Sequence, residues 1–494
     1  MSLTRRQLHK LGLLGSSALL LPRWMTSGAF GLSGSGWTKP LNQGLASPAV
    51  APFTRPLVIP PVLAPEYSDN TLDFYRVTMQ QAEVEIIPGT RTTIWGYNGL
   101  YPGPTIRARS GRRVIVGQQN RLPESMSVHL HGGHTPPSSD GHPYDLIAPG
   151  ADKKYDYPNN QIPTTLWYHD HAVDATGRHV YMGLAGFYIM TDNYEDSLPL
   201  PTGDNDVPLM IQDRLFNADG SLNYPLTDEN IVRGVVGDTI LVNGVVQPYY
   251  EVGTRKIRFR ILNGSNARPY WLYLSSGQPL TQIGSDGGLL SRPVSRNRIK
   301  VFPAERIDVV IDFSGYPLGT SVVLRDLFED ETSLGNVLEF RVVREESDDS
   351  SVPETLRYVD LIPESAATTR RTFTLDQTII NGRTLLTING RLFDPNYVDA
   401  RPRLNDVEIW SFVNNAGYPI HPIHIHDIEW QILDIGGRRP AAGDDGWKDV
   451  FPVPFHSPVR VIGKFVDLTG IYVFHCHKLE HEDHAMMAQF EVLP

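Results

Sequence analysis

The residues best suited to chemistry are histidines spaced two apart. Four His-x-His pairs occur, at His129/His131, His169/His171, His424/His426 and His475/His477. With 16 histidines among 494 residues, chance would place about 0.5 such pairs in the chain. Residues i and i+2 of a strand share one face, so each pair would present two imidazoles together. Neutral imidazoles bind zinc, copper, iron and nickel, and pairs from both ends of the chain predict a metal cluster between domains.

The single cysteine narrows the choice of metal. Cys476 lies between His475 and His477, so on a strand its side chain would point to the opposite face. The residues that could join it are His421, His481 and Met486. Two histidines, a cysteine and a soft axial thioether form the ligand set of a blue-copper electron-transfer site. Met487 follows directly, and the sequence leaves open which methionine is axial.

Four segments resemble the copper motifs of the multicopper oxidases. They are His129-Leu-His-Gly132, Trp167-Tyr-His-Asp-His171, His421-Pro-Ile-His-Ile-His426 and His475-Cys-His-Lys-Leu-Glu-His481. Residues 98–106 and 284–288 also fit the family, and residues 481–487 resemble most closely the bilirubin oxidase and spore-coat laccase branch. The resemblance runs from about Tyr67 to the C-terminus.

The resemblance implies copper as the cofactor, with four ions per chain and the following ligands. The type 1 copper would take His421, Cys476, His481 and Met486. The type 2 copper would take His129 and His424. The type 3 pair would take His131, His169 and His477 on one ion and His171, His426 and His475 on the other.

Two carboxylates are candidate proton carriers. Reduction of O₂ to water needs protons as well as electrons, and carboxylates near the cluster could deliver them. Asp140 lies shortly after the first histidine pair, and Glu482 directly follows His481. Both match acidic residues with that role in the resembling branch. The alternatives are an Asx-turn for Asp140 and a solvated loop carboxylate for Glu482.

The elements that must position these residues are short strands. Runs rich in β-branched and aromatic residues, such as 113–117, 256–262, 306–313 and 407–413, are separated by Gly, Pro, Asn and Asp. Polar and Pro-rich stretches at 197–206 and at 345 to about 369 resemble linkers. Together with the resemblance, this predicts an all-β chain of three consecutive cupredoxin-like Greek-key β-sandwich domains. Their expected ranges are 60–200, 205–345 and 365–494, with the blue-copper site in the last.

Composition excludes several classes of protein. One cysteine cannot form an internal disulfide, a zinc finger or an iron–sulfur site. The net charge of −11 argues against a nucleic-acid binder. Beyond the N-terminal segment no stretch is long and apolar enough to span a membrane. We expect a monomer that works with O₂ and a small-molecule reductant.

The N-terminal segment, residues 1–29, has the pattern of a secretory signal. Arg5, Arg6 and Lys10 precede an apolar run over 11–21, and the segment contains no acidic residue. The adjacent arginines indicate a twin-arginine signal, which exports folded proteins, although an amphipathic helix is the alternative. We therefore expect a periplasmic or secreted protein.

The resemblance implies a laccase- or bilirubin-oxidase-like enzyme. Such an enzyme couples one-electron oxidation of phenolic, aminophenolic or tetrapyrrole substrates to four-electron reduction of O₂ to water. A cuprous oxidase for copper tolerance is the alternative, but the nine methionines form no Met-rich tract. A non-enzymatic copper-binding or scaffold protein would not need the full ligand set. Tyr418 and Trp430 are candidates to line the substrate surface, with core packing as the alternative for Trp430.

Overall fold

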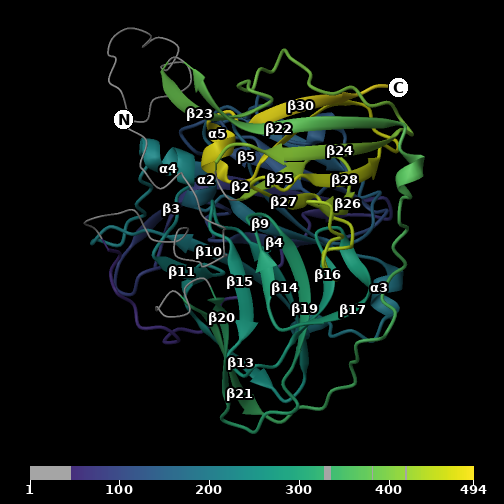
Figure 1. Cartoon of the computed structure of the whole chain (residues 1–494). Coiled ribbons are helices and arrows are strands. Elements are labelled where there is room, and N and C mark those ends of the chain that lie inside the picture. Colours follow the sequence, from purple (N-terminus) through teal and green to yellow (C-terminus); the bar gives the residue numbers. More distant parts are fainter. Residues whose placement is uncertain (1–45, 328–334, 381, 418–419) are drawn as a thin grey trace, which may run out of the picture.

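The computed structural model describes residues 46–327, 335–380, 382–417 and 420–494 (Figure 1). Strand makes up 47% of the structure and helix 8%, which confirms the predicted all-β class. The predicted signal segment 1–29 lies outside the described residues. Among the described residues, no helix combines the length and the apolar character needed to cross a bilayer.

The N-terminal part forms two sheets that pack face to face around a shared apolar core. One sheet contains β1 (Tyr67–Ser68), β2 (Leu72–Val84), β3 (Thr92–Tyr97), β5 (Arg113–Asn120) and β7 (Asp152–Tyr157). The other contains β4 (Gly103–Arg109), β9 (Ala185–Thr191), β8 (Thr165–Asp170) and β6 (Val128–His131). A short 3₁₀ turn η2 (Pro137–Ser139) and helices α2 (Thr176–Met182) and α3 (Asn193–Ser197) complete this part.

The middle part forms a larger pair of sheets, drawn in teal at the bottom of Figure 1. Its first sheet contains β10 (Asp206–Arg214), β11 (Thr239–Val242), β12 (Val245–Val246), β14 (Lys256–Asn263), β16 (Leu280–Ser285), β17 (Gly288–Arg296) and β19 (Arg306–Asp312). Its second contains β13 (Tyr249–Gly253), β15 (Tyr270–Leu274), β18 (Ile299–Val301), β20 (Ser321–Asp326) and β21 (Asn336–Arg344). The 3₁₀ turn η3 (Gly203–Asn205) precedes these strands, and α4 (Asp228–Arg233) lies between β10 and β11.

The C-terminal part lies at the top of Figure 1, in green and yellow. One sheet contains β22 (Thr369–Ile380), β23 (Arg383–Ile388), β24 (Val407–Asn414), β26 (Trp430–Ile435) and β28 (Val459–Lys464). The other contains β25 (Ile420–Ile425), β27 (Val450–Pro454), β29 (Gly470–Cys476) and β30 (Met487–Val492). The 3₁₀ turn η6 (Glu364–Ala366) comes before β22, and helix α5 (Leu479–Asp483) joins β29 to β30.

Each sheet draws its strands from only one of the three predicted domain ranges. Alternating buried positions on facing sheets give each part its own apolar cluster, as sandwich packing requires. The domain limits at 60–200, 205–345 and 365–494 themselves stay predictions. We refer to the three sheet pairs below as the first, second and third sandwich.

Strand register aligns the histidine pairs. In the first sandwich β6 runs antiparallel to β8 with His129 opposite His169. In the third, β25 runs antiparallel to β29 with His424 opposite His475. Three of the four pairs end one residue beyond their strand, so the sequence prediction that each pair lies wholly within a strand holds only for His129/His131. The pairs therefore lie at strand ends, where two sandwiches can meet.

Candidate metal centre

One candidate site lies within the third sandwich. Nδ1 of His421 is 3.4 Å from Sγ of Cys476, and that sulfur is 3.5 Å from Nδ1 of His481. The two Nδ1 atoms are 3.3 Å apart, so three ligand-type atoms converge on one point. All three residues are buried. Burial raises the pKa of the Cys476 thiol to about 12, so a bound metal ion has to displace its proton.

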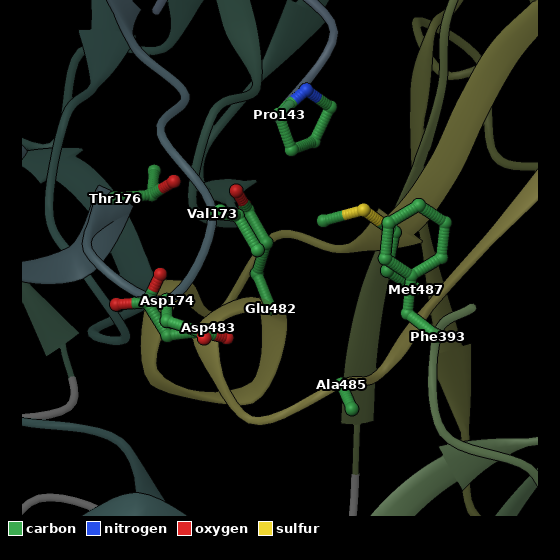
Figure 2. Close-up of a pocket in the computed structure, with 9 residues that line it drawn as sticks. All are labelled: Pro143, Val173, Asp174, Thr176, Phe393, Glu482, Asp483, Ala485 and Met487. Carbon is green, nitrogen blue, oxygen red and sulfur yellow. The ribbon is translucent and has the colours of Figure 1, made fainter. Parts of the chain in front are cut away.

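The two adjacent methionines point into different surroundings. Met486 is fully buried in the same apolar cluster as Cys476, and its carbonyl accepts a hydrogen bond from the Cys476 backbone N–H. Met487 belongs to a separate small cluster with Phe393 and Val473. It also lines a pocket, where Figure 2 shows its thioether beside Phe393. The packing thus places Met486, and not Met487, in the core that holds Cys476.

The second sandwich covers one edge of this site. His481 donates from Nε2 to the carbonyl of Val232, in helix α4, at 2.9 Å. The bond fixes the ring so that Nδ1 is the nitrogen without a proton, which is the form that binds a metal ion. Backbone of α4 therefore covers the outer edge of the imidazole.

A second site begins with two histidines that face each other across the first and third sandwiches. Nδ1 of His129 donates to the carbonyl of Asp140 at 2.6 Å, and Nδ1 of His424 donates to the carbonyl of Asp449 at 2.9 Å. Their Nε2 atoms are 3.3 Å apart. Burial lowers the pKa of both rings far below the usual value, so both are neutral. Two Nε2 lone pairs that face each other at this distance repel unless a cation lies between or beside them.

Three more imidazoles converge in the same way. Nε2 of His475 lies 3.2 Å from Nε2 of His171 and 3.3 Å from Nε2 of His426. Their Nδ1 atoms face carboxylates: His171 and His475 face Glu482 at 3.4 and 3.0 Å, and His426 faces Asp140 at 2.8 Å. Each carboxylate can hold a proton on Nδ1, which leaves Nε2 as a ligand atom.

The remaining three histidines form a third group. Potential ligand atoms of His131, His169 and His477 lie within 4.8 Å of one another, and all three side chains are buried. His169 donates from Nδ1 to the carbonyl of Asp170 at 2.8 Å. Within the described part of the chain, its Nε2 and both ring nitrogens of His477 are buried without a hydrogen-bond partner. Buried polar nitrogens normally have a partner, and a bound metal ion would supply one here.

Asp140 and Glu482 both contact the clustered histidines, and both are buried. Burial raises the pKa of Asp140 well above its usual value, and the Asp427 carboxylate adds to that rise. Burial alone would also raise the pKa of Glu482, but the imidazoles of His475 and His171 outweigh it and lower the pKa. Burial of Glu482 does not fit the solvated-carboxylate alternative, and the Asp140 carboxylate faces His426, not the backbone of a local turn.

Glu482 also lines a small pocket. Figure 2 shows Pro143 above, Asp174 and Asp483 at the lower left, Phe393 and Met487 at the right, and Val173 beside Glu482. Asp483 accepts a hydrogen bond from the Gly177 backbone N–H at 2.8 Å. Glu482 thus contacts both this pocket and the rings of His171 and His475.

Other residues depart from the sequence expectations or add to them. Trp430 is fully buried in the third core, so core packing describes it better than a substrate surface. Tyr418 lies outside the described residues. His134 belongs to none of the four histidine pairs. It bridges Asp427 and Asp467, at 3.0 and 2.5 Å.

Sequence reasoning missed Asp449 and Arg306, which lie against the cluster. Nε2 of His131 is 3.1 Å from the Asp449 carboxylate, which in turn pairs with Arg306. The one sequence signal is that Lys448 and Asp449 directly precede an apolar strand.

The comparisons with known proteins agree with this geometry. Family models described as multicopper oxidase match residues 78–195 and 361–494. A laccase from Bacillus stratosphericus is 38% identical over 89% of this chain and 99% of its own length. A bilirubin oxidase from Albifimbria verrucaria is 34% identical over 91% of this chain and 83% of its own length. A solved multicopper oxidase from Pediococcus acidilactici superposes with a TM-score of 0.83 at 34% identity, over 92% of this chain and 95% of that one. With its histidine clusters in place, the protein is a copper-dependent oxidoreductase that uses O₂, and the chain belongs to the multicopper oxidase family.

Proposed function

We propose that the converging side chains hold four coppers per chain. His421, Cys476, His481 and Met486 would hold a type 1 copper, and His129 with His424 a type 2 copper. His131, His169 and His477 would hold one type 3 copper, and His171, His426 and His475 the other. The observation that carries the proposal is the set of buried Nε2 atoms that face each other at 3.2–3.3 Å while their Nδ1 atoms are held by carbonyls and carboxylates.

Copper, when bound, supplies the one-electron redox chemistry that the oxidation of the donor and the reduction of O₂ require. The chain connects the two sites covalently, because Cys476 belongs to the first and its neighbours His475 and His477 to the second. This proximity supports a short route for electrons between the two sites.

We propose that Glu482 and Asp140 hold and transfer the protons for O₂ reduction. Glu482 contacts two of the clustered rings and lines the pocket of Figure 2. Asp140 contacts His426 with its carboxylate and His129 with its backbone carbonyl. Both lie within hydrogen-bond reach of the ligand rings, which is the placement that general acid–base groups need.

We propose that the reducing substrate is a phenol, an aminophenol or a tetrapyrrole. The laccase and bilirubin oxidase relatives support this class. Outer-sphere electron transfer needs access only to an edge of the type 1 site, and α4 lies at that edge through the Val232–His481 hydrogen bond. Because α4 covers that edge, a donor that docks on α4 would lie close to His481 without touching it.

We also propose export through the twin-arginine route to the periplasm or the medium, and a monomeric state. The paired Arg5 and Arg6 before an apolar run support the export route. Transport of a folded protein suits a protein that receives its cofactor before it crosses the membrane.

Metal content, visible spectrum and O₂ uptake test the proposed function together. We expect about four coppers per chain, an intense blue band from the Cys476 site, and O₂ consumption with a phenolic donor. A donor panel of phenols, bilirubin and cuprous ion would then rank the substrate classes. A colourless protein that binds no copper after reconstitution would refute the proposal.

A further inference from the structure

A buried ion pair links the second sandwich to the histidine cluster, although the second sandwich supplies none of the clustered histidines. Arg306, at the start of β19, donates from Nη1 to Oδ1 of Asp449 at 2.7 Å and from Nη2 to Oδ2 of the same carboxylate. The two side chains are 0% and 2% exposed. A two-pronged contact of this kind fixes the plane of the carboxylate as well as its charge.

Asp449 in turn contacts one histidine of the first sandwich and one of the third. Its Oδ1 lies 3.1 Å from Nε2 of His131, and its backbone carbonyl accepts from Nδ1 of His424 at 2.9 Å. Nδ1 of His131 is buried, with no hydrogen-bond partner among the described residues. Asp449 therefore determines which nitrogen of His131, and which nitrogen of His424, remains for a metal ion.

The sequence around the cluster leaves room for this pair. Gly132 follows His131 with a backbone φ of 80°. A Cβ atom at this position would lie 2.6 Å from Nη2 of Arg306 and 2.6 Å from Oδ2 of Asp449. A larger residue after the first histidine pair would clash with the ion pair, and the positive φ also favours glycine at this position.

The segment 284–288, which has no role in the proposed chemistry, holds the pair from the other side. Oδ1 of Asp286 accepts from the backbone N–H of Arg306 at 2.8 Å, and its backbone carbonyl accepts from Nη2 of Arg306 at 3.2 Å. Its Oδ2 lies 2.9 Å from Nζ of Lys448, the residue before Asp449. Asp286 is fully buried, so both partners of the ion pair are anchored to the β16–β17 turn.

We propose that Arg306 and Asp449 are positioning residues, through which the second sandwich sets the orientation of His131 and His424 and thereby the copper affinity of the cluster. The proposal rests on the copper ligation proposed above. Residues that orient metal-binding histidines typically contribute 10–100-fold to metal affinity. A shift of this size is expected for copper at the cluster, while the Cys476 site keeps its copper.

The chain contains a matched control on the same strand. Asp308 lies two residues after Arg306 on β19 and is also buried. It pairs with Arg258 and Arg260 and receives a hydrogen bond from Thr165, whose backbone carbonyl accepts from Arg306. Among the described residues, this second cluster of charges forms no hydrogen bond or ion pair with a histidine of the cluster. It therefore reports the stability cost of disturbing a buried ion pair alone.

The experiment compares Asp449→Asn and Arg306→Lys with the controls Asp308→Asn and Arg260→Lys in the full-length, copper-reconstituted protein. Copper per chain is measured during titration with EDTA, together with the blue band of the Cys476 site, the paramagnetic signal of the type 2 copper and the melting temperature. We expect the first two variants to lose cluster copper at 10–100-fold lower EDTA concentration than the wild type, with an altered type 2 signal and an intact blue band. The controls should melt earlier but retain their cluster copper.

Other results would contradict either the inference or the proposed function on which it rests. If the wild type loads copper and all four variants release it alike, or if the first two variants fail to fold while both controls fold, the pair serves stability alone and the inference is wrong. If the wild type itself takes no copper at the histidine cluster, the proposed function fails before the inference is reached.

Discussion

The two candidate copper sites are built on different principles. The ligand atoms of the Cys476 site come from one sandwich, beside its apolar core, and His481 donates a hydrogen bond to the second sandwich. The eight-histidine cluster is shared by two sandwiches, and carbonyls, carboxylates and an ion pair surround it. The first site therefore depends on the folding of one domain, whereas the second depends on how domains dock. Variants that disturb one site, or the docking of the sandwiches, therefore test whether the two sites form independently.

Loss of the cysteine should have the largest effect. Cys476→Ser removes the soft thiolate from the type 1 site, so we expect the blue band and nearly all oxidase turnover to disappear, with loss of about one copper per chain. The eight-histidine cluster should retain its copper, because none of its ligands changes. Metal analysis and the type 2 signal check this. A simultaneous loss of cluster copper would show that the two sites do not form independently.

Glu482→Gln should impair the reaction at the histidine cluster and leave the Cys476 site intact. We expect the blue band to remain and turnover at limiting O₂ to fall by roughly 10²–10⁴-fold, because the amide cannot transfer a proton. Asp483→Asn is the matched control, since it changes the neighbouring buried carboxylate in the same pocket. In the described part of the chain, Asp483 forms no ion pair with a clustered histidine. Equal turnover for wild type and Glu482→Gln would remove Glu482 from the relay.

Docking of the first sandwich against the third should depend on pH through His134. Burial alone would lower the pKa of His134, but Asp427 and Asp467 outweigh it and raise the pKa to about 9, from 6.5 in the unfolded chain. The stabilisation is therefore complete below pH 6.5 and disappears as the pH rises through 9. It amounts to at most about 3 kcal/mol, less the screening at Asp467, which is 58% exposed.

Denaturant unfolding of wild type and His134→Gln between pH 6 and 10 measures this effect. The wild type should lose stability over that range, and the variant should start lower and change less. Cluster copper should become easier to remove with rising pH, while the blue site changes little. Parallel pH curves for the two proteins would contradict a role for His134 in docking.

The sequence predicted which histidines converge better than it predicted the residues that support them. Histidine pairs and a histidine–cysteine–histidine run are local patterns, and strand geometry alone places such residues on known faces. Arg306 and Asp449, in contrast, are 143 residues apart, and nothing in the sequence near either one indicates the other. The same holds for His134 and Asp467. Such contacts arise only when sandwiches dock, and the docking geometry is not encoded in a local pattern.

The choice between Met486 and Met487 also depends on tertiary packing that the sequence does not show. Adjacent residues at the start of a strand point to opposite faces, so the sequence alone could not decide which thioether faces Cys476. The structure places Met486 in the Cys476 core and Met487 beside the pocket of Glu482. The two side chains therefore report on different sites although they are neighbours in the chain.

The smallest expected effect follows from that difference. Met486→Leu keeps the side-chain volume but removes the thioether that would stabilise oxidised copper, so the potential of the blue site should rise and turnover should change by about tenfold at most. Met487→Leu is the natural control: it preserves an apolar wall of the pocket and should leave the potential unchanged. Redox titration of the blue band measures both. A shift in the Met487 variant alone would reassign the axial position, and no shift in either would show that the blue site has no thioether ligand.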